Sequence, residues 1–291
     1  MSFLRIPALL LAAATVTVAG CGGGDGASSS TTTGRSTTSM STSTSTSTST
    51  SSTSTTAVAP TAPVVVYLVR DEKVAPVRRA ATDATPRAAV DELVKGVTAG
   101  DTGLSSAVPS GTTVRSLAVS GGVATVDLSG AFAGGGGSLS MQERVAQVVF
   151  TLTRFPAVQS VSFELDGQPV TSLGGEGLVL DHPQARADWE ALTPAVLVED
   201  PLPGDRVMSG FTISGTANTF EATFMARLTD QAGTVLYEHY VTATSGSGTR
   251  GTFSQVIDVV GAHAGAATLR VWEASAKDGS DLHVVTIPLV I

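Results

Sequence analysis

A long run of serine and threonine near the start of the chain decides where folded structure can begin. Residues 28–56 are almost entirely Ser and Thr, interrupted by Gly34, Arg35 and Met40. Such a segment has almost no apolar side chains to bury, so it cannot offset the entropy lost on ordering. We therefore expect a disordered tether over residues 21–62, and folded structure only after it.

The first 21 residues have the pattern of an export signal. Arg5 gives a positive start, residues 6–19 are largely apolar, and small residues lead into Cys21, the only cysteine. The apolar run is too short to span a bilayer. The pattern resembles a bacterial lipoprotein signal peptide with its lipobox. The resemblance implies that residues 1–20 are removed and that Cys21 is lipidated, with palmitate among its acyl chains.

Lipidation would place the protein outside the cytoplasmic membrane and anchor it there, since two or three acyl chains hold a protein stably in a bilayer. The alternative is an ordinary secreted protein with a cysteine near the cleavage site by chance. The tether would then be a spacer with an extended reach of about 115 Å. Its Ser and Thr, next to Pro60 and Pro63, leave O-glycan attachment open.

The charge balance excludes some partners. The chain has 17 basic and 25 acidic residues, and 6 and 14 of these lie from residue 171 onward. An acidic C-terminal half argues against nucleic acid and against direct docking on anionic lipid. If Cys21 carries lipid, no thiol remains for a disulfide, a metal site or a nucleophile.

Residues 63–170 predict an α+β domain of order β-α-β-β-α-β, with a further short strand after the first and two helices on one sheet face. The continuous apolar run at residues 64–70 is typical of a strand buried on both faces. The other expected strands cover residues 74–80, 112–119, 123–128 and 158–165. The last is closed by an Asp166-Gly167 turn, and residues 120–122 predict a hairpin between the third and fourth.

Two helices are expected in this domain. Thr85 and Pro86 read as the cap and first residue of one, with inward-facing Val90, Leu93, Val94 and Val97 and a stop at Gly100. A capping box at residues 140–143 predicts the start of the other, with five inward-facing residues: Val145, Val148, Val149, Leu152 and Phe155. Residues 148–153 alone would also suit a strand, but the cap favours helix. Residues 134–137, four glycines, predict a flexible gap.

Several segments of this domain occur in an order that resembles a known family. They are residues 103–109, Gly111-Thr112, Val114-Arg115, residues 122–129 and residues 142–161. These segments resemble the GerMN domain, the sporulation and spore-germination module of bacterial envelope lipoproteins. The resemblance implies packing with other envelope proteins. The four-glycine insert departs from the family pattern.

Residues 171–194 are expected to be a linker, helical around residues 185–192, with Trp189 covering an interface. Residues 195–291 then predict an all-β immunoglobulin-like sandwich without a disulfide. Seven strands are expected at residues 196–198, 207–216, 220–228, 235–243, 253–259, 267–273 and 283–291. Hairpin turns are expected at residues 230–233 and 277–280. The alternation from Phe220 to Leu228 places Phe220, Ala222, Phe224, Ala226 and Leu228 on one face.

The second domain also resembles a known module. The residues that carry this resemblance are 201–205, 214–217, 220–222 and 273–280. They resemble the immunoglobulin-like domain that often follows GerMN in proteins of the spore-germination type. The resemblance implies a second binding surface behind the first domain.

No motif for catalysis, metal binding or a cofactor stands out. The four histidines, 182, 239, 263 and 283, are not at ligand spacing, and no G-x-S-x-G elbow is present. Residues 278–281 resemble a calcium loop only in part, and a hairpin turn explains them better. Asp71 and Glu72 are predicted on a strand, where they would point to opposite faces and not form an acid/base pair. Arg70, Arg78 and Arg79 form a candidate partner surface, the alternative being solvated charges at strand ends.

We therefore expect a membrane-anchored extracytoplasmic lipoprotein with non-catalytic binding or assembly modules, no cofactor, and envelope proteins as partners. Binding of a cell-wall carbohydrate or peptide is the alternative. A wall-active hydrolase is the more distant one, and it would require a cleft with convergent carboxylates.

Overall fold

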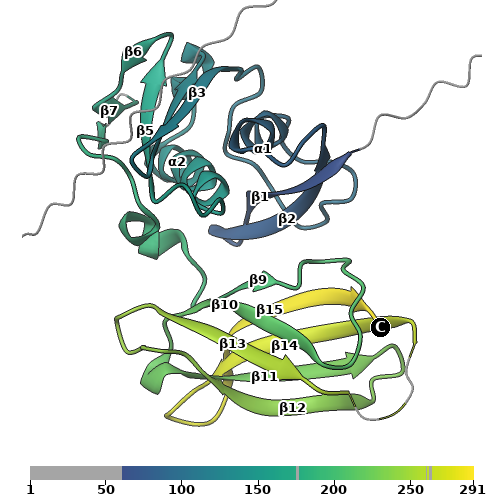
Figure 1. Ribbon diagram of the computed structural model, residues 1–291. Coiled ribbons are helices and arrows are strands. Elements are labelled where there is room, and N and C mark those ends of the chain that lie inside the picture. Colours follow the sequence, from purple (N-terminus) through teal and green to yellow (C-terminus); the bar gives the residue numbers. More distant parts are fainter. Residues whose placement is uncertain (1–60, 175–176, 260, 262–263) are drawn as a thin grey trace, which may run out of the picture. The chain divides into compact units, whose positions relative to one another are not determined.

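The computed structural model describes residues 61–174, 177–259, 261 and 264–291, which belong to one compact unit (Figure 1). Cys21, the tether up to residue 60 and His263 lie outside the described residues. No helix within the described ranges is long and apolar enough to cross a membrane.

The N-terminal part of this unit mixes helices and strands in the expected order. Its elements are β1 (Ala62–Arg70), β2 (Lys73–Ala81), α1 (Pro86–Leu93), β3 (Val114–Ser120), β4 (Val123–Leu128), a 3₁₀ turn at Gly130–Ala133, α2 (Ser138–Leu152), β5 (Ser160–Leu165) and β6 (Gln168–Pro169). The predicted α+β class is confirmed.

The strands do not form the single sheet that the sequence suggested. Among the described strands β1 pairs only with β2, and an isolated bridge joins Val69 to Ser105. β3, β4, β5 and β6 form a second sheet in that order. Helix α2 contacts both β1 and β5, and Figure 1 shows it between the two sheets. The two sheets thus cover different sides of α2. β4 and β5 are parallel because α2 is the crossover between them.

Helix α1 begins as predicted and ends earlier. The Oγ1 of Thr85 accepts a hydrogen bond from the backbone N–H of Ala88, and Pro86 opens the helix. The helix ends at Leu93, and Gly96 then adopts φ +76°. The predicted stop at Gly100 is therefore wrong, and Val97 is exposed beyond the helix end.

Helix α2 starts two residues before the predicted capping box. Its N-cap is Gly137, which has no side chain to cap the helix, and Ser140 instead accepts a hydrogen bond from Arg144. The valines predicted to face inward are buried, and Phe155 is partly buried just past the helix. Residues 148–152 are helical, so the strand alternative is excluded.

The buried Arg144 fixes the glycine-rich loop that the sequence predicted to be a flexible gap. Its guanidinium donates to the carbonyl oxygens of Phe132 (2.6 Å), Gly134 (3.1 Å) and Gly135 (2.9 Å). A Cβ on Gly136 would lie 2.9 Å from the same guanidinium, and the residue has φ +80°. Glycine is therefore required there so that the loop can wrap around the arginine.

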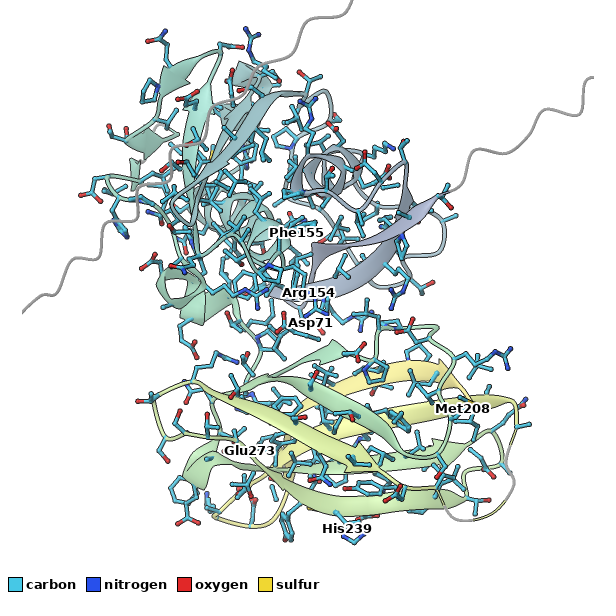
Figure 2. All side chains as sticks on the ribbon, viewed as in Figure 1. Asp71, Arg154, Phe155, Met208, His239 and Glu273 are labelled. Atoms are coloured by element: carbon cyan, nitrogen blue, oxygen red, sulfur yellow. The ribbon has the colours of Figure 1, made fainter. Side chains whose placement is uncertain are left out.

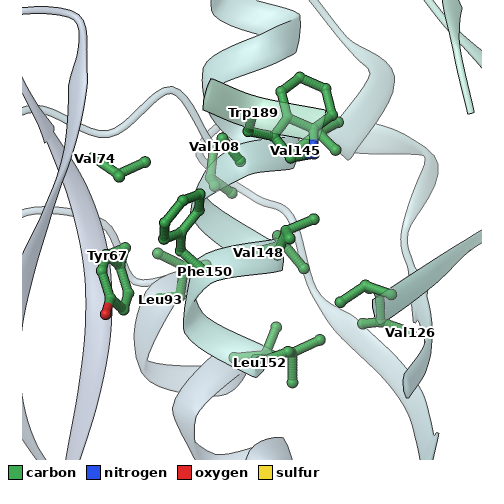
Figure 3. Close-up of a cluster of buried hydrophobic side chains, with 14 of the residues drawn as sticks. Tyr67, Val74, Leu93, Val108, Val126, Val145, Val148, Phe150, Leu152 and Trp189 are labelled. Atoms are coloured by element: carbon green, nitrogen blue, oxygen red, sulfur yellow. The ribbon is translucent and has the colours of Figure 1, made fainter. Parts of the chain in front are cut away.

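The connecting segment packs on the α+β core. It contains the short strands β7 (Ser172–Leu173) and β8 (Leu178–Val179) and a 3₁₀ helix, η2 (Arg186–Leu192). Trp189 is buried in the same apolar cluster as Val145 and Phe150, as Figure 3 shows. Trp189 thus lies in the core of the α+β part and does not cover an interface as predicted.

The C-terminal part is an all-β sandwich. Its strands are β9 (Val196–Asp200), β10 (Phe211–Ala217), β11 (Thr223–Asp230), β12 (Val235–Thr242), β13 (Gly251–Ile257), β14 (Ala266–Ala274) and β15 (Asp281–Val290). They form two sheets, β13-β10-β9 and β12-β11-β14-β15. All seven predicted strands are present, and both predicted hairpin turns are confirmed.

One side chain of the predicted alternation, that of Phe220, is exposed instead of facing the core. Phe224, Ala226 and Leu228 are buried between the sheets as expected, whereas Phe220 is 53% exposed. Residues 220–222 form a 3₁₀ turn with Glu221 and Ala222 at positive φ. The period of two therefore starts only at Thr223, where the strand begins.

Candidate functional site

An apolar hollow lies between β2 and an edge of the sandwich. Its walls come from residues within 70–77, from residues 194–198 and from residues 283–287, together with Leu104 and Pro203. We call this hollow the cleft. Its volume is about 470 Å³, which lies in the range of small-ligand and peptide pockets.

The β1–β2 hairpin forms one wall. Asp71 and Glu72 are the two residues of its turn, both with positive φ (49° and 60°). Their predicted position on a strand is therefore wrong: the pair forms the tip of a tight hairpin, a conformation that usually favours Asn-Gly. The turn leaves Asp71 at the mouth of the cleft, and Figure 2 labels it at the hairpin tip.

An irregular stretch of the edge strand β15 forms the opposite wall. The register between β14 and β15 shifts between Val271 and Glu273, so β15 carries an extra residue there. His283 lies in this β-bulge with φ 52°, a conformation that is uncommon outside glycine. Its ring Nε2 lies 3.7 Å from Glu273 Oε2. The bulge turns Val284, which is 44% exposed, toward the cleft.

A buried polar cluster joins β1 to β9, the strand whose residues 196–198 also line the cleft. Tyr67 of β1 donates its hydroxyl hydrogen to Glu199 of β9, and Arg186 Nη1 lies 2.8 Å from the same carboxylate. The guanidinium of Arg186 also lies 4.8 Å from the ring centre of Phe150, at cation–π distance. Arg154 approaches the carboxylate at 3.7 Å. We call Tyr67, Arg186 and Glu199 the interlock.

The interlock shifts the pKa values of its members. Burial raises the pKa of Tyr67 well above its usual range, and the charge of Glu199 raises it further. Burial works against ionisation of Glu199, but the Arg186 charge and the hydrogen bonds from Tyr67 and Arg186 outweigh it. The pKa of Glu199 is therefore lowered. At neutral pH the cluster holds a tyrosine hydroxyl, a carboxylate and a guanidinium, each with a partner.

Two family models match the chain. The model for sporulation and spore germination (Germane) matches residues 52–171, and the model for the immunoglobulin-like domain of bacterial spore germination (Gmad2) matches residues 195–280. The chain carries these two domains, in this order. The two domain resemblances drawn from the residues are therefore confirmed.

Solved structures with low similarity complete the comparison. The first GerMN domain of the sporulation protein GerM from Bacillus subtilis matches at 22% identity and TM-score 0.37, over 44% of this chain and 99% of that one. The tandem GerMN domains of GerM match at 18% identity and TM-score 0.39, over 68% of this chain and 62% of that one. A structure described as a candidate lipoprotein from Clostridium perfringens matches at 19% identity and TM-score 0.33, over 46% and 93%. No curated protein matched the chain.

The three arginines predicted as a partner surface, Arg70, Arg78 and Arg79, line one hollow of about 480 Å³ together. Arg78 pairs with Asp205 of the Gmad2 domain at 2.8 Å, and Arg79 pairs with Asp101 at 2.5 Å. Of the three arginines, Arg70 alone has no ion pair with another described residue, and it also lines the cleft. The structure thus brings the three arginines together, two of them paired with a carboxylate, and their role as a partner surface stays a prediction.

The histidines that are described lie apart. His182 sits between Asp181 and Asp188 on the surface, and Figure 2 shows His239 on the outside of β12. Asp278 accepts hydrogen bonds from Ser280 in the predicted hairpin turn. Within the described ranges, no group of three or more His, Cys, Asp or Glu is arranged to hold a metal ion.

Sequence reasoning missed the cleft and the interlock. Tyr67 and Glu199 are 132 residues apart in the chain, and the cleft collects three distant stretches. One local signal was available: Glu199 ends a run of apolar residues in β9, and a carboxylate that is buried beside such a run needs a partner.

Proposed function

We propose that this protein is an extracytoplasmic lipoprotein, anchored through Cys21, that binds and assembles envelope proteins without catalysing a reaction. The observation that carries the proposal is the preformed cleft, which the Germane and Gmad2 domains build together. The interlock ties β1 to β9 beside it. A pocket supported by a buried polar cluster is suited to binding, because little of its shape must be ordered when a partner arrives.

The anchor is supported by the sequence at residues 1–21 and by the family of the two domains. A tether over residues 21–62 would let both domains reach partners well above the membrane surface. The domains themselves belong to sporulation and spore-germination families, which fits a role at the cell envelope.

The composition of the cleft supports binding rather than hydrolysis. Among its described lining residues Asp71 is the only carboxylate, whereas hydrolysis of a glycosidic bond generally uses two. Most of the wall is valine, alanine, proline and leucine. An apolar surface with a few polar groups is typical of a protein-binding or peptide-binding pocket.

Fractionation and cross-linking in living cells would test this proposal. The wild-type protein should partition into the detergent phase and give discrete protein adducts, whereas Cys21→Ala should appear in the soluble extracytoplasmic fraction and lose them. Retention of Cys21→Ala in the detergent phase would refute the lipid anchor. Adducts to wall fragments alone, with salt-sensitive pelleting on purified sacculi, would favour the wall-binding alternative.

A further inference from the structure

The outer edge of β15 already accepts a strand along part of its length. β15 pairs with β14 on one side. On the other side, the N–H of Gly204 donates to the carbonyl of Pro288 (2.8 Å), and the N–H of Val290 donates to the carbonyl of Asp205 (3.0 Å). A parallel bridge joins Arg206 to Val290. Residues 204–207 thus act as a short added strand.

The same edge is open where it enters the cleft. In an antiparallel strand every second residue directs its backbone N–H and carbonyl to the same side. Thr286 therefore directs these groups away from β14, as Pro288 does with its carbonyl and Val290 with its N–H. No described residue forms a backbone hydrogen bond with Thr286 on this side. Unpaired edge groups of this kind are a template for another strand.

The facing wall supplies apolar contacts rather than a second ladder. In the register of the hairpin, Arg70 pairs with Lys73 across the tight turn, so Val74 and Pro76 direct their backbones away from β1. Pro76 has no N–H to donate, which interrupts the edge of β2. An extended chain in the cleft would therefore take its hydrogen bonds from β15 and pack its side chains against the half-buried Ala75 and Pro76.

The charges at the mouth favour an acidic partner. Arg70 has no ion pair with another described residue, and Lys73 donates to the carbonyl of Ala191, which leaves its charge without a carboxylate. Asp71 is the one opposing charge in the lining. Arg70 also borders a second hollow of about 480 Å³, which shares Val77 and Thr286 with the cleft. A chain following β15 would therefore pass this guanidinium.

We propose that the cleft binds an extended segment of an envelope protein, which adds as a strand to β15 alongside residues 283–287. Alternate side chains of the segment are apolar and fill the cleft, and a carboxylate near one end pairs with Arg70. About five residues of the partner, roughly 15 Å of strand, would be held in this way. This inference rests on the proposed function, that the protein binds envelope proteins.

The test uses the full-length protein in detergent micelles and a phage-displayed library of random linear peptides. Enriched peptides are synthesised with a fluorescent label, and their affinity is measured by fluorescence polarisation. Thr286→Pro removes the outward N–H at a position equivalent to that of Pro288, and Arg70→Glu reverses the proposed contact. Lys277→Glu, in an exposed hairpin turn, is the control with the same change of charge.

The proposal expects enriched peptides with alternating apolar residues and an acidic residue. Their affinity should fall about tenfold or more with Thr286→Pro and with Arg70→Glu, and less than twofold with Lys277→Glu. Amide hydrogen exchange gives a second measurement on the unmutated protein: the Thr286 amide should become protected when the peptide is added. This measurement does not depend on whether the variants fold.

Failure to enrich any peptide, or peptides that leave the exchange of Thr286 unchanged, would overturn the proposal. Equal loss of affinity with Lys277→Glu would do the same, since it would indicate a general charge effect. The proposed function is tested separately by cross-linking in cells. Discrete protein adducts there, together with failure here, would refute strand addition and leave the assembly role intact.

Discussion

Removal of Arg186 is the perturbation that most directly tests the interlock. Arg186→Met keeps an unbranched apolar stem over Phe150 but leaves the Glu199 carboxylate without its closest cation. Breaking a buried ion pair from one side costs about 3–5 kcal/mol. The side chain of Arg186 is 26% exposed and that of Glu199 is 11% exposed, so water screens part of the loss. We expect a decrease of about 2–4 kcal/mol in the free energy of unfolding.

The second cation near Glu199 provides the matched control. Arg154 lies 3.7 Å from the carboxylate, and its side chain is 35% exposed. A more distant and more solvated pair of this kind contributes about 0–1 kcal/mol. Arg154→Met removes the same charge from the same neighbourhood, so it should cost at least 1 kcal/mol less than Arg186→Met, by the same two estimates.

Urea unfolding followed by tryptophan fluorescence measures both effects. The chain has two tryptophans: Trp189 lies in the core of the Germane domain, and Trp272 lies on β14 of the Gmad2 domain. Variants with a single tryptophan report on each domain separately. Because the interlock joins β1 to β9, the two transitions should coincide in the wild type and separate in Arg186→Met.

A double-mutant cycle decides whether the ion pair itself is responsible. Glu199→Gln should destabilise the protein alone, but add little in the background of Arg186→Met, because the partner charge is already absent. Equal costs for Arg186→Met and Arg154→Met, or additive effects of Arg186→Met and Glu199→Gln, would refute the account of the interlock.

Three further predictions follow from single groups. Because folding lowers the pKa of Glu199, the ionised carboxylate stabilises the folded state above the unfolded pKa of about 4.3, and this stabilisation is lost as pH falls through the folded pKa. The free energy of unfolding of Glu199→Gln should therefore depend less on pH in acid than that of the wild type. An unchanged dependence on pH would contradict this. Gly215→Ala would place a Cβ 2.0 Å from the carbonyl oxygen of Leu197, so thermal unfolding should show a loss of about 1–3 kcal/mol; a wild-type melting temperature would be inconsistent with the β9–β10 contact. The pKa of His182 is raised by its hydrogen bond to Asp181, so its NMR titration in Asp181→Asn should move to lower pH, and an unmoved midpoint would disprove the contact.

Most of the local structure was predictable because it follows from short-range patterns. The apolar run around Val66 predicts a buried strand, and Thr85-Pro86 predicts the start of α1, because both depend on residues next to one another in sequence. The strands of the Gmad2 domain were predictable for the same reason: alternation and turn residues recur along the chain. Family resemblance then supplied the order of the two domains.

The remaining features depend on contacts that no short window contains. The capping-box pattern at Ser140 was overridden because Arg144 takes that side chain to fix the preceding loop. The split into two sheets depends on which strands face α2, which periodicity does not specify. The sequence marked Arg70 as a candidate surface residue, but other residues that line the cleft with it, such as Thr286, lie more than two hundred residues away in the chain. A site built from three distant stretches becomes visible only in the folded chain.

Site-specific photo-cross-linking in living cells tests the central claim most directly. A photoreactive residue replaces Val284 in the cleft, and the matched control replaces Tyr240, which is 70% exposed on β12. The account predicts a discrete protein adduct from position 284 that is absent from position 240 and is lost with Arg70→Glu. Adducts of equal yield from both positions, or an adduct from position 240 alone, would contradict the claim that the cleft is where a partner binds.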